Sequence, residues 1–215
     1  MKPVGLLGGS FDPIHNGHLQ LARDALKHLP VAEVRFLPAA QPWQKGPITA
    51  AEHRAHMVQL AIAGDSRFVL DMREIERGGI TYTIDTLRAV RSQLPRSSLV
   101  LIMGSDQFAR LNTWHDWEQL VEIAHIAVAA RAGAQPPSSG PMKTMLARNR
   151  QDAASLTSKL SGNIVEFEMT PVNVSATEVR RLLRQPNSTE RSQRLSAMVP
   201  DAVLDYIDSH QLYRD

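Results

Sequence analysis

The sequence predicts an α/β fold built on a doubly wound parallel sheet of about five or six strands. Short apolar runs alternate with longer amphipathic segments along most of the chain. Residues 99–103 are apolar on both faces, which is typical of a central parallel strand. A length of 215 residues with 43% hydrophobic content suits one domain with a substantial core. We therefore expect a single domain over 1–215, with a sheet core at about 1–170 and a small helical part at about 171–215.

The expected elements follow one another in a regular order. Strands are expected at 3–8, 33–37, 68–71, 98–103, 125–130 and 163–168, and helices between them near 17–29, 50–63, 81–94 and 117–123. Residues 135–141 are rich in Pro, Ser and Gly and indicate a loop, after which 143–160 is expected to form a polar helix. Two more helices are expected at 177–184 and 201–210. Ligands of such sheets bind at the carboxyl ends of the strands, near the point where strand order reverses.

The composition of the chain excludes several classes of ligand and of catalytic chemistry. The formal net charge is +2 and the pI is near 9.1, which suits a phosphate-rich small ligand but is too weak to indicate nucleic acid. The absence of cysteine excludes disulfides, thiolate catalysis and cysteine zinc sites. No apolar run approaches the roughly 20 residues that span a bilayer, and the first residues begin a strand without a signal peptide. We expect a cytoplasmic protein that can form an oligomer and that binds neither membrane nor nucleic acid.

Residues 8–18 are the most informative stretch of the chain. Gly8 and Gly9 end an apolar run and let a ligand approach the main chain, and the following Asp-Pro stops the strand. Asn16 is the expected N-cap of the next helix, whose unpaired N–H groups favour an anion. His15 and His18 are three residues apart, so both can donate hydrogen bonds to one phosphoryl group. The stretch therefore predicts a phosphate site.

Other interpretations of this stretch are weaker. The histidine pair would suit zinc, but no third ligand is evident nearby, and zinc needs three or four. The glycines also occur in dinucleotide-binding turns, but the third glycine and the ribose-binding acid of that pattern are poorly matched. A purely structural turn would not need two histidines.

The pattern Gly-x-Phe-x-Pro-x-His-x-Gly-His, here 9–18, resembles the signature of the nucleotidylyltransferase superfamily. The resemblance implies a Rossmann-like α/β fold. It also implies transfer of a nucleotidyl group to a phosphate with release of pyrophosphate.

Two further segments resemble phosphate-binding parts of this superfamily. Ser175, Thr177 and Arg180 match the pattern Ser-x-Thr-x-x-Arg, although Ser175 with Glu178 is also an ordinary capping box. Combined with the first motif, the segment is expected to bind the β- and γ-phosphates of ATP. Lys45, in the loop 38–47, resembles a superfamily lysine that reaches the phosphates, and an exposed loop lysine is an equally good interpretation.

Three stretches indicate the acceptor. Residues 81–87, 104–108 and 114–117 resemble bacterial nicotinate-nucleotide adenylyltransferases, and the similarity runs almost end to end. The resemblance implies that Trp114 stacks on a pyridine ring and that the backbone amides of Thr83 and His115 bind its carboxylate. Asp106 would accept from a ribose hydroxyl, and Tyr82 would border the acceptor. Packing alone is the alternative for both tryptophans and is favoured for Trp117; Tyr82 and Asp85 are equally well explained as residues at the start of a helix.

The expected reaction joins ATP and nicotinate mononucleotide to give deamido-NAD and pyrophosphate, with Mg²⁺ carried on the phosphates rather than by a protein metal site. The alternatives are a phosphopantetheine-type adenylyltransferase, a non-catalytic nucleotide sensor and, least favoured, a dehydrogenase. The expected catalytic residues are His15, His18, Lys45 and Arg180. The expected ATP-binding residues are Gly8, Gly9, Ser10, Phe11, His15, His18, Gly104, Asp106, Ser175, Thr177 and Arg180. The expected acceptor-binding residues are Tyr82, Thr83, Asp106, Trp114 and His115.

Overall fold

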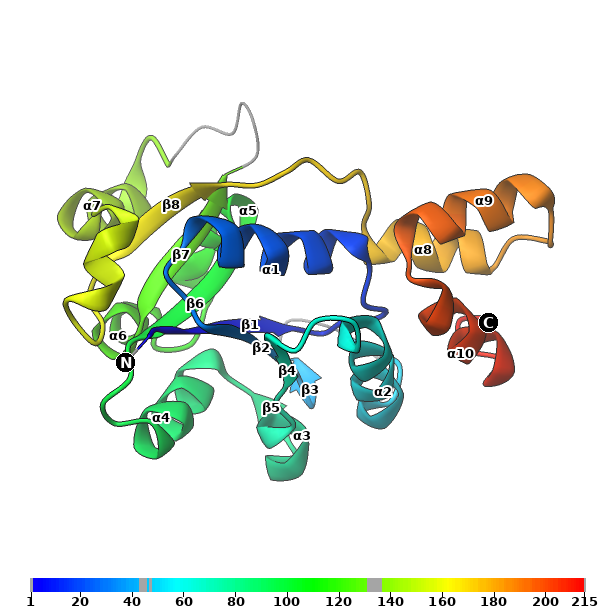
Figure 1. Ribbon diagram of the computed structural model, residues 1–215, viewed down its shortest axis with the longest axis horizontal. Coiled ribbons are helices and arrows are strands. Elements are labelled where there is room, and N and C mark those ends of the chain that lie inside the picture. Colours follow the sequence, from blue (N-terminus) through cyan, green and yellow to red (C-terminus); the bar gives the residue numbers. More distant parts are fainter. Residues whose placement is uncertain (1, 43–45, 47, 131–136, 215) are drawn as a thin grey trace.

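The computed structural model describes residues 2–42, 46, 48–130 and 137–214, which form a parallel sheet flanked by helices (Figure 1). The sheet has six strands in the order β4-β2-β1-β6-β7-β8, and every neighbouring pair is parallel. All six expected strands are present within one residue of their expected bounds. They are β1 (Val4–Gly9), β2 (Glu33–Pro38), β4 (Phe68–Leu70), β6 (Leu99–Gly104), β7 (His125–Ala130) and β8 (Ile164–Glu168).

Strand order reverses between β1 and β6, and the two strands separate there. Their pairing ends at Leu6 and Leu101, although β1 continues to Gly9 and β6 to Gly104. On its other side β1 stays paired with β2 as far as Gly9. The carboxyl ends of the two central strands therefore diverge, which opens the crevice that ligands of doubly wound sheets occupy.

Helices cover both faces of the sheet and enclose two hydrophobic cores. The first core contains α1 (Asn16–His28) and α2 (Ala51–Ile62), and the second contains α4 (Thr83–Gln93) and α6 (Trp117–Ile123). In Figure 1, α1 lies above β1 and α4 lies below it. The C-terminal helices α8 (Ala176–Leu183), α9 (Thr189–Met198) and α10 (Asp201–Ser209) pack against the first core near α1 and α2. None of the helices in the described part of the chain is long and apolar enough to cross a bilayer.

The helix expected at 143–160 is wrong in its extent. The chain forms α7 (Gly140–Asn149), then an extended Arg150 that bridges to Ile164, and then a 3₁₀ helix, η2 (Ala153–Thr157). The carboxylate of Asp152 accepts from the backbone N–H of Ser155 at 3.0 Å and begins the second helix. A side chain that caps a new helix competes with continuation of the old one, which explains the break.

Several short elements were not expected from the sequence. They are β3 (Gln41–Pro42), which pairs with β5 (Ile80–Thr81), the helices α3 (Arg73–Arg77), α5 (Ser105–Phe108) and η1 (Leu111–Thr113), and the longer α9. Of the residues of α9 only Leu195 is fully buried, so the segment lacks the apolar periodicity that would reveal it. The pair β3–β5 joins the loop after β2 to the segment that leads into α4.

Candidate active site

A cavity of about 390 Å³ lies at the carboxyl ends of β1 and β6, where the two strands separate. Both sequence motifs and the expected acceptor segments contribute to its walls. The expected site residues that line it are Gly8, Gly9, Ser10, His15, His18, Thr83, Gly104, Asp106, Trp114 and Ser175.

The other expected site residues lie elsewhere, and Lys45 lies outside the described residues. Phe11 is buried beneath the first motif, and its ring meets that of His18 edge-on at 5.0 Å. Tyr82 and His115 pair through their rings at 4.5 Å, beside the cavity rather than in its wall. Thr177 is exposed on α8. Phe11 therefore packs against His18, and Arg180 also lies outside the cavity wall. The roles expected for Lys45, Tyr82, His115, Thr177 and Arg180 stay predictions.

The two histidines of the first motif stack on each other at the start of α1. Their ring centroids are 3.7 Å apart at 21°, and the backbone N–H of His15 donates to Nδ1 of His18 at 3.3 Å. Because Nδ1 of His18 accepts this hydrogen bond, a neutral His18 carries its proton on Nε2. Burial lowers the pKa of His15 to about 4, so its imidazole is neutral at pH 7. His15 is therefore a neutral hydrogen-bond donor rather than a fixed cation.

The expected N-cap of α1 was wrong by one residue. His15 is the N-cap, in an extended conformation with φ −150° and ψ 169°, and Asn16 begins the helix. The side chain of Asn16 instead donates to the carbonyl of Ala197 at 2.9 Å, which attaches α1 to α9. This contact joins residues 181 positions apart, so no local pattern indicates it.

The second motif lies directly against the first. A Cβ added at Gly17 would come within 3.0 Å of Val174 Cγ1, so the glycine permits the close approach of the two segments. Ser175 caps α8 as expected, because its Oγ accepts from the backbone N–H of Glu178 at 3.2 Å. The carboxylate of Glu178 forms ion pairs with Arg181 and Arg194.

Arg180 reaches from α8 to the first motif. Its Nη1 donates to the main-chain carbonyl of Asp12 at 2.5 Å and lies 3.9 Å from the Asp12 carboxylate. That carboxylate is 4% exposed and accepts a hydrogen bond from Tyr213 near the C-terminus, at 2.7 Å. Burial raises the pKa of Tyr213, which keeps its hydroxyl a donor. The first motif is thus held from two distant parts of the chain.

Arg54, which the sequence reasoning missed, lies fully buried beneath the site. Its guanidinium donates to the carbonyls of Ser10, Ala39, Ala40 and Thr49 at 2.6 to 2.9 Å. It therefore ties the first motif to the loop after β2. An arginine on a helix normally suggests a solvated side chain, so only its unusually apolar helix neighbours hinted at burial.

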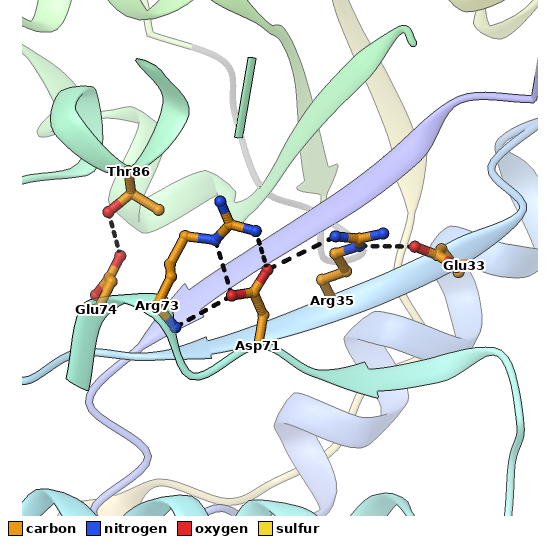
Figure 2. Close-up of polar contacts among 6 residues, drawn as sticks. All are labelled: Glu33, Arg35, Asp71, Arg73, Glu74 and Thr86. Carbon is orange, nitrogen blue, oxygen red and sulfur yellow. Dashed lines mark hydrogen bonds and ion pairs between the residues drawn. The ribbon is translucent and has the colours of Figure 1, made fainter. Parts of the chain in front are cut away.

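Glu74 was also missed, although it lines the cavity and is only 5% exposed. Its Oε1 accepts from the hydroxyl of Thr86 on α4 at 2.6 Å (Figure 2). Burial raises the pKa of Glu74 to about 7, despite the opposing effect of this hydrogen bond. A single Glu in a charged segment carries no local signal that separates it from a surface residue.

Trp114 and Trp117 occupy different surroundings. Trp114 follows η1 and Trp117 begins α6, and both pack against the second core, but only Trp114 also lines the cavity. Asp106, on α5, lines the same cavity, and its Oδ1 lies 2.7 Å from where a Cβ on Gly104 would be. The described residues contain no group of three or more His, Asp or Glu side chains suited to hold a metal ion.

Comparison with known proteins agrees with this architecture. A family model described as cytidylyltransferase-like matches residues 6–182. A protein of Dechloromonas aromatica named "Probable nicotinate-nucleotide adenylyltransferase" is 43% identical over 221 residues, which cover 100% of this chain and 99% of that protein. A protein of Pseudomonas syringae pv. tomato with the same name is 41% identical, covering 99% of this chain and 94% of that protein.

Solved structures show the same fold. The Plasmodium falciparum nicotinic acid mononucleotide adenylyltransferase in complex with NaAD superposes with a TM-score of 0.74. It is 20% identical in sequence, and the match covers 99% of this chain and 98% of that one. The family match, the full-length relatives and this shared fold agree, and the chain belongs to the cytidylyltransferase-like family, among the nicotinate-nucleotide adenylyltransferases.

Proposed function

We propose that this protein transfers the adenylyl group of ATP to nicotinate mononucleotide, giving deamido-NAD and pyrophosphate. The observation that carries the proposal is one cavity lined by residues of both phosphate motifs and by Thr83 and Trp114 of the acceptor segments. Full-length relatives that bear the name of this activity support the choice of acceptor.

The reaction requires no covalent enzyme intermediate. An oxygen of the acceptor's 5′-phosphate attacks the α-phosphorus of ATP in line, and a new P–O–P bridge forms. The bond from the α-phosphorus to the oxygen bridging to the β-phosphate breaks, and its electrons leave with pyrophosphate. Since the nucleophile is already an anion, catalysis consists of positioning and stabilisation of charge.

The first motif is proposed to hold the α-phosphate. His15, which is neutral at pH 7, and His18 would hydrogen-bond its oxygens while charge develops on them. Ser175 and the first N–H groups of α8 would bind the departing phosphates, helped by Thr177, Lys45 and Arg180. Mg²⁺ would arrive as part of the ATP substrate, held mainly through phosphate oxygens.

The other end of the cavity is proposed to take the pyridine nucleotide. Trp114 would stack on the ring, and the N–H of Thr83, the first residue of α4, would face the ring carboxylate with that of His115. Asp106 would accept from a ribose hydroxyl. The carboxylate is the distinguishing feature of this acceptor, because N–H donors match it better than they match an amide.

A pyrophosphate-release assay with ATP and a panel of acceptors tests this proposal. We expect release with nicotinate mononucleotide, and weaker release with nicotinamide mononucleotide. Release with phosphopantetheine alone would establish the main rival activity. ATP binding without release for any acceptor would instead indicate a nucleotide sensor.

A further inference from the structure

Glu74 is a buried carboxyl group at the cavity to which the proposed reaction gives no task. It lines the cavity together with Thr83, Thr86 and Leu87 of α4, which are spaced three and four residues apart and so share one helix face. Thr86 donates directly to Glu74 (Figure 2). The carboxyl therefore lies against the helix whose first residue is proposed to receive the acceptor's carboxylate.

Arg73, next to Glu74 in the chain, and Arg35 on β2 are engaged by other carboxylates. The guanidinium of Arg73 makes two hydrogen bonds to Asp71, at 2.8 and 2.6 Å. Arg35 on β2 donates to Glu33 at 2.7 Å and lies 3.8 Å from Asp71 (Figure 2). Neither arginine forms an ion pair with Glu74, so its charge has little direct compensation.

Charged groups around Glu74 act on its ionisation in both directions. Arg77, on the same short helix α3, and Arg73 favour the ionised carboxyl, whereas Asp71 opposes it. Arg54, beneath the first motif, also interacts electrostatically with Glu74. Burial outweighs these charges and the hydrogen bond from Thr86, and it raises the pKa of Glu74 to about 7. The carboxyl consequently changes charge in the physiological range.

We propose that Glu74 is a specificity-determining residue whose carboxyl must be uncharged when an acceptor bearing a ring carboxylate binds beside α4. Binding of the acid acceptor then takes up a proton whenever Glu74 is ionised beforehand, whereas binding of the corresponding amide does not. This inference rests on the proposed function, because it places the acceptor's carboxylate at the start of α4.

The physical reason is repulsion between two carboxylates in a partly desolvated space. The first turn of α4 offers N–H groups and the positive end of one helix dipole, which favour a single negative charge. A nearby second carboxylate disfavours ionisation of the first. When Glu74 is protonated, the acceptor's carboxylate is the only negative charge at the start of α4. When Glu74 is ionised, its charge repels that carboxylate.

Isothermal titration calorimetry between pH 6 and 8.5 tests the proposal with nicotinate and nicotinamide mononucleotide as probes. Buffers with different ionisation enthalpies report the protons taken up. Above pH 7 we expect uptake approaching one proton for the acid, and its affinity relative to the amide falling by up to about tenfold per pH unit. Both probes carry the same ribose phosphate. Titration of the phosphate and of the histidines therefore changes both affinities alike, and its effect cancels in the ratio of the two affinities.

Three variants sharpen the test. Glu74→Gln should abolish the proton uptake and the pH dependence of the ratio, whereas Glu76→Gln, exposed on the same helix, should keep both. Thr86→Val removes a hydrogen bond that lowers the pKa of Glu74, so the pH dependence should begin at higher pH. If Glu74→Gln does not fold, the pH dependence of the affinity ratio in the wild type and in Thr86→Val tests the proposal.

The outcomes separate this inference from the proposed function. A pH-independent ratio in the wild type, or a pH dependence that survives Glu74→Gln, overturns the role of Glu74 even when pyrophosphate is released normally. Proton uptake on binding without pyrophosphate release supports the role of Glu74 and overturns the proposed function. The absence of any binding of nicotinate mononucleotide overturns both.

Discussion

The hydroxyl of Tyr213 donates a hydrogen bond to Oδ1 of Asp12 at 2.7 Å, although the two residues lie 201 positions apart. Asp12 belongs to the first motif, and its main-chain carbonyl also accepts from Arg180. The end of the chain therefore holds the loop that carries His15, on the side where α8 begins. This contact makes the C-terminal helices part of the support of the active site.

Tyr213→Phe should weaken both the fold and the positioning of the motif. Loss of the donor leaves a buried carboxylate with fewer hydrogen bonds, so we expect about 1–3 kcal/mol less stability toward urea. We expect kcat to fall more than the affinity for nicotinate mononucleotide. Tyr206→Phe, which removes the hydrogen bond between Tyr206 and His53 on α2, is the control and should leave kcat unchanged. Equal kcat in both variants would exclude a positioning role for Tyr213.

His18→Ala should lower turnover without unfolding the protein. A lost donor to the developing charge costs about 3–4 kcal/mol of transition-state stabilisation, which slows turnover by about 10²–10³. Steady-state kinetics with saturating ATP and circular dichroism check the two parts. His53→Ala, on α2 away from the cavity, is the matched control. A variant that keeps near-wild-type turnover would remove His18 from the mechanism.

Arg54→Met should be among the most destabilising substitutions in this chain. It leaves the carbonyls of Ser10, Ala39, Ala40 and Thr49 without their buried donor, and we expect a loss of about 3–5 kcal/mol. Thermal unfolding measures the effect. Arg54→Lys keeps the charge but not the planar fork, so it should recover only part of the stability. Arg67→Met, at an exposed site, should leave stability nearly unchanged.

Glu74→Gln should change how stability depends on pH. The folded-state pKa of about 7 lies above the ordinary value of 4.5, so the folded protein binds more protons between these values. Stability contributed by protonated Glu74 is complete below pH 4.5 and is lost as pH rises to 7. The variant should therefore gain stability relative to the wild type over this range, by up to about 3 kcal/mol. Urea unfolding at pH 4.5, 5.5 and 7 measures the difference in stability between the variant and the wild type. A difference that stays constant with pH would contradict the raised pKa of Glu74.

Ionisation of His15 changes the folding stability with pH in the direction opposite to Glu74 and lowers it at acid pH. Its folded-state pKa of about 4 lies below the ordinary 6.5, so its contribution is complete above pH 6.5 and is lost as pH falls toward 4. The two slopes oppose each other in the wild type between pH 4.5 and 6.5. Comparison of Glu74→Gln with the wild type at each pH isolates the contribution of the Glu74 carboxyl to the folding stability.

Local sequence was enough to predict the sheet, because each strand is a short apolar run whose burial follows from its own residues. Residues 99–103 are apolar on both faces and form β6 beside the central strand β1. The two motifs were recognised from spacing within about ten residues, and their binding of phosphate stays a prediction. The helix expected at 143–160 was wrong because the competing cap at Asp152 is decided by side-chain geometry, which periodicity does not record.

By itself, the sequence determined the strands, the two motifs and the family, all of which depend on neighbouring residues. Only the tertiary structure decided that Tyr213 reaches Asp12, that Arg54 is buried beneath two loops, and that Glu74 lines the cavity. The physical reason is that burial and partnership of a charged side chain depend on which distant segments surround it. An Arg or Glu in a polar helix has the same local pattern whether it faces water or a cavity.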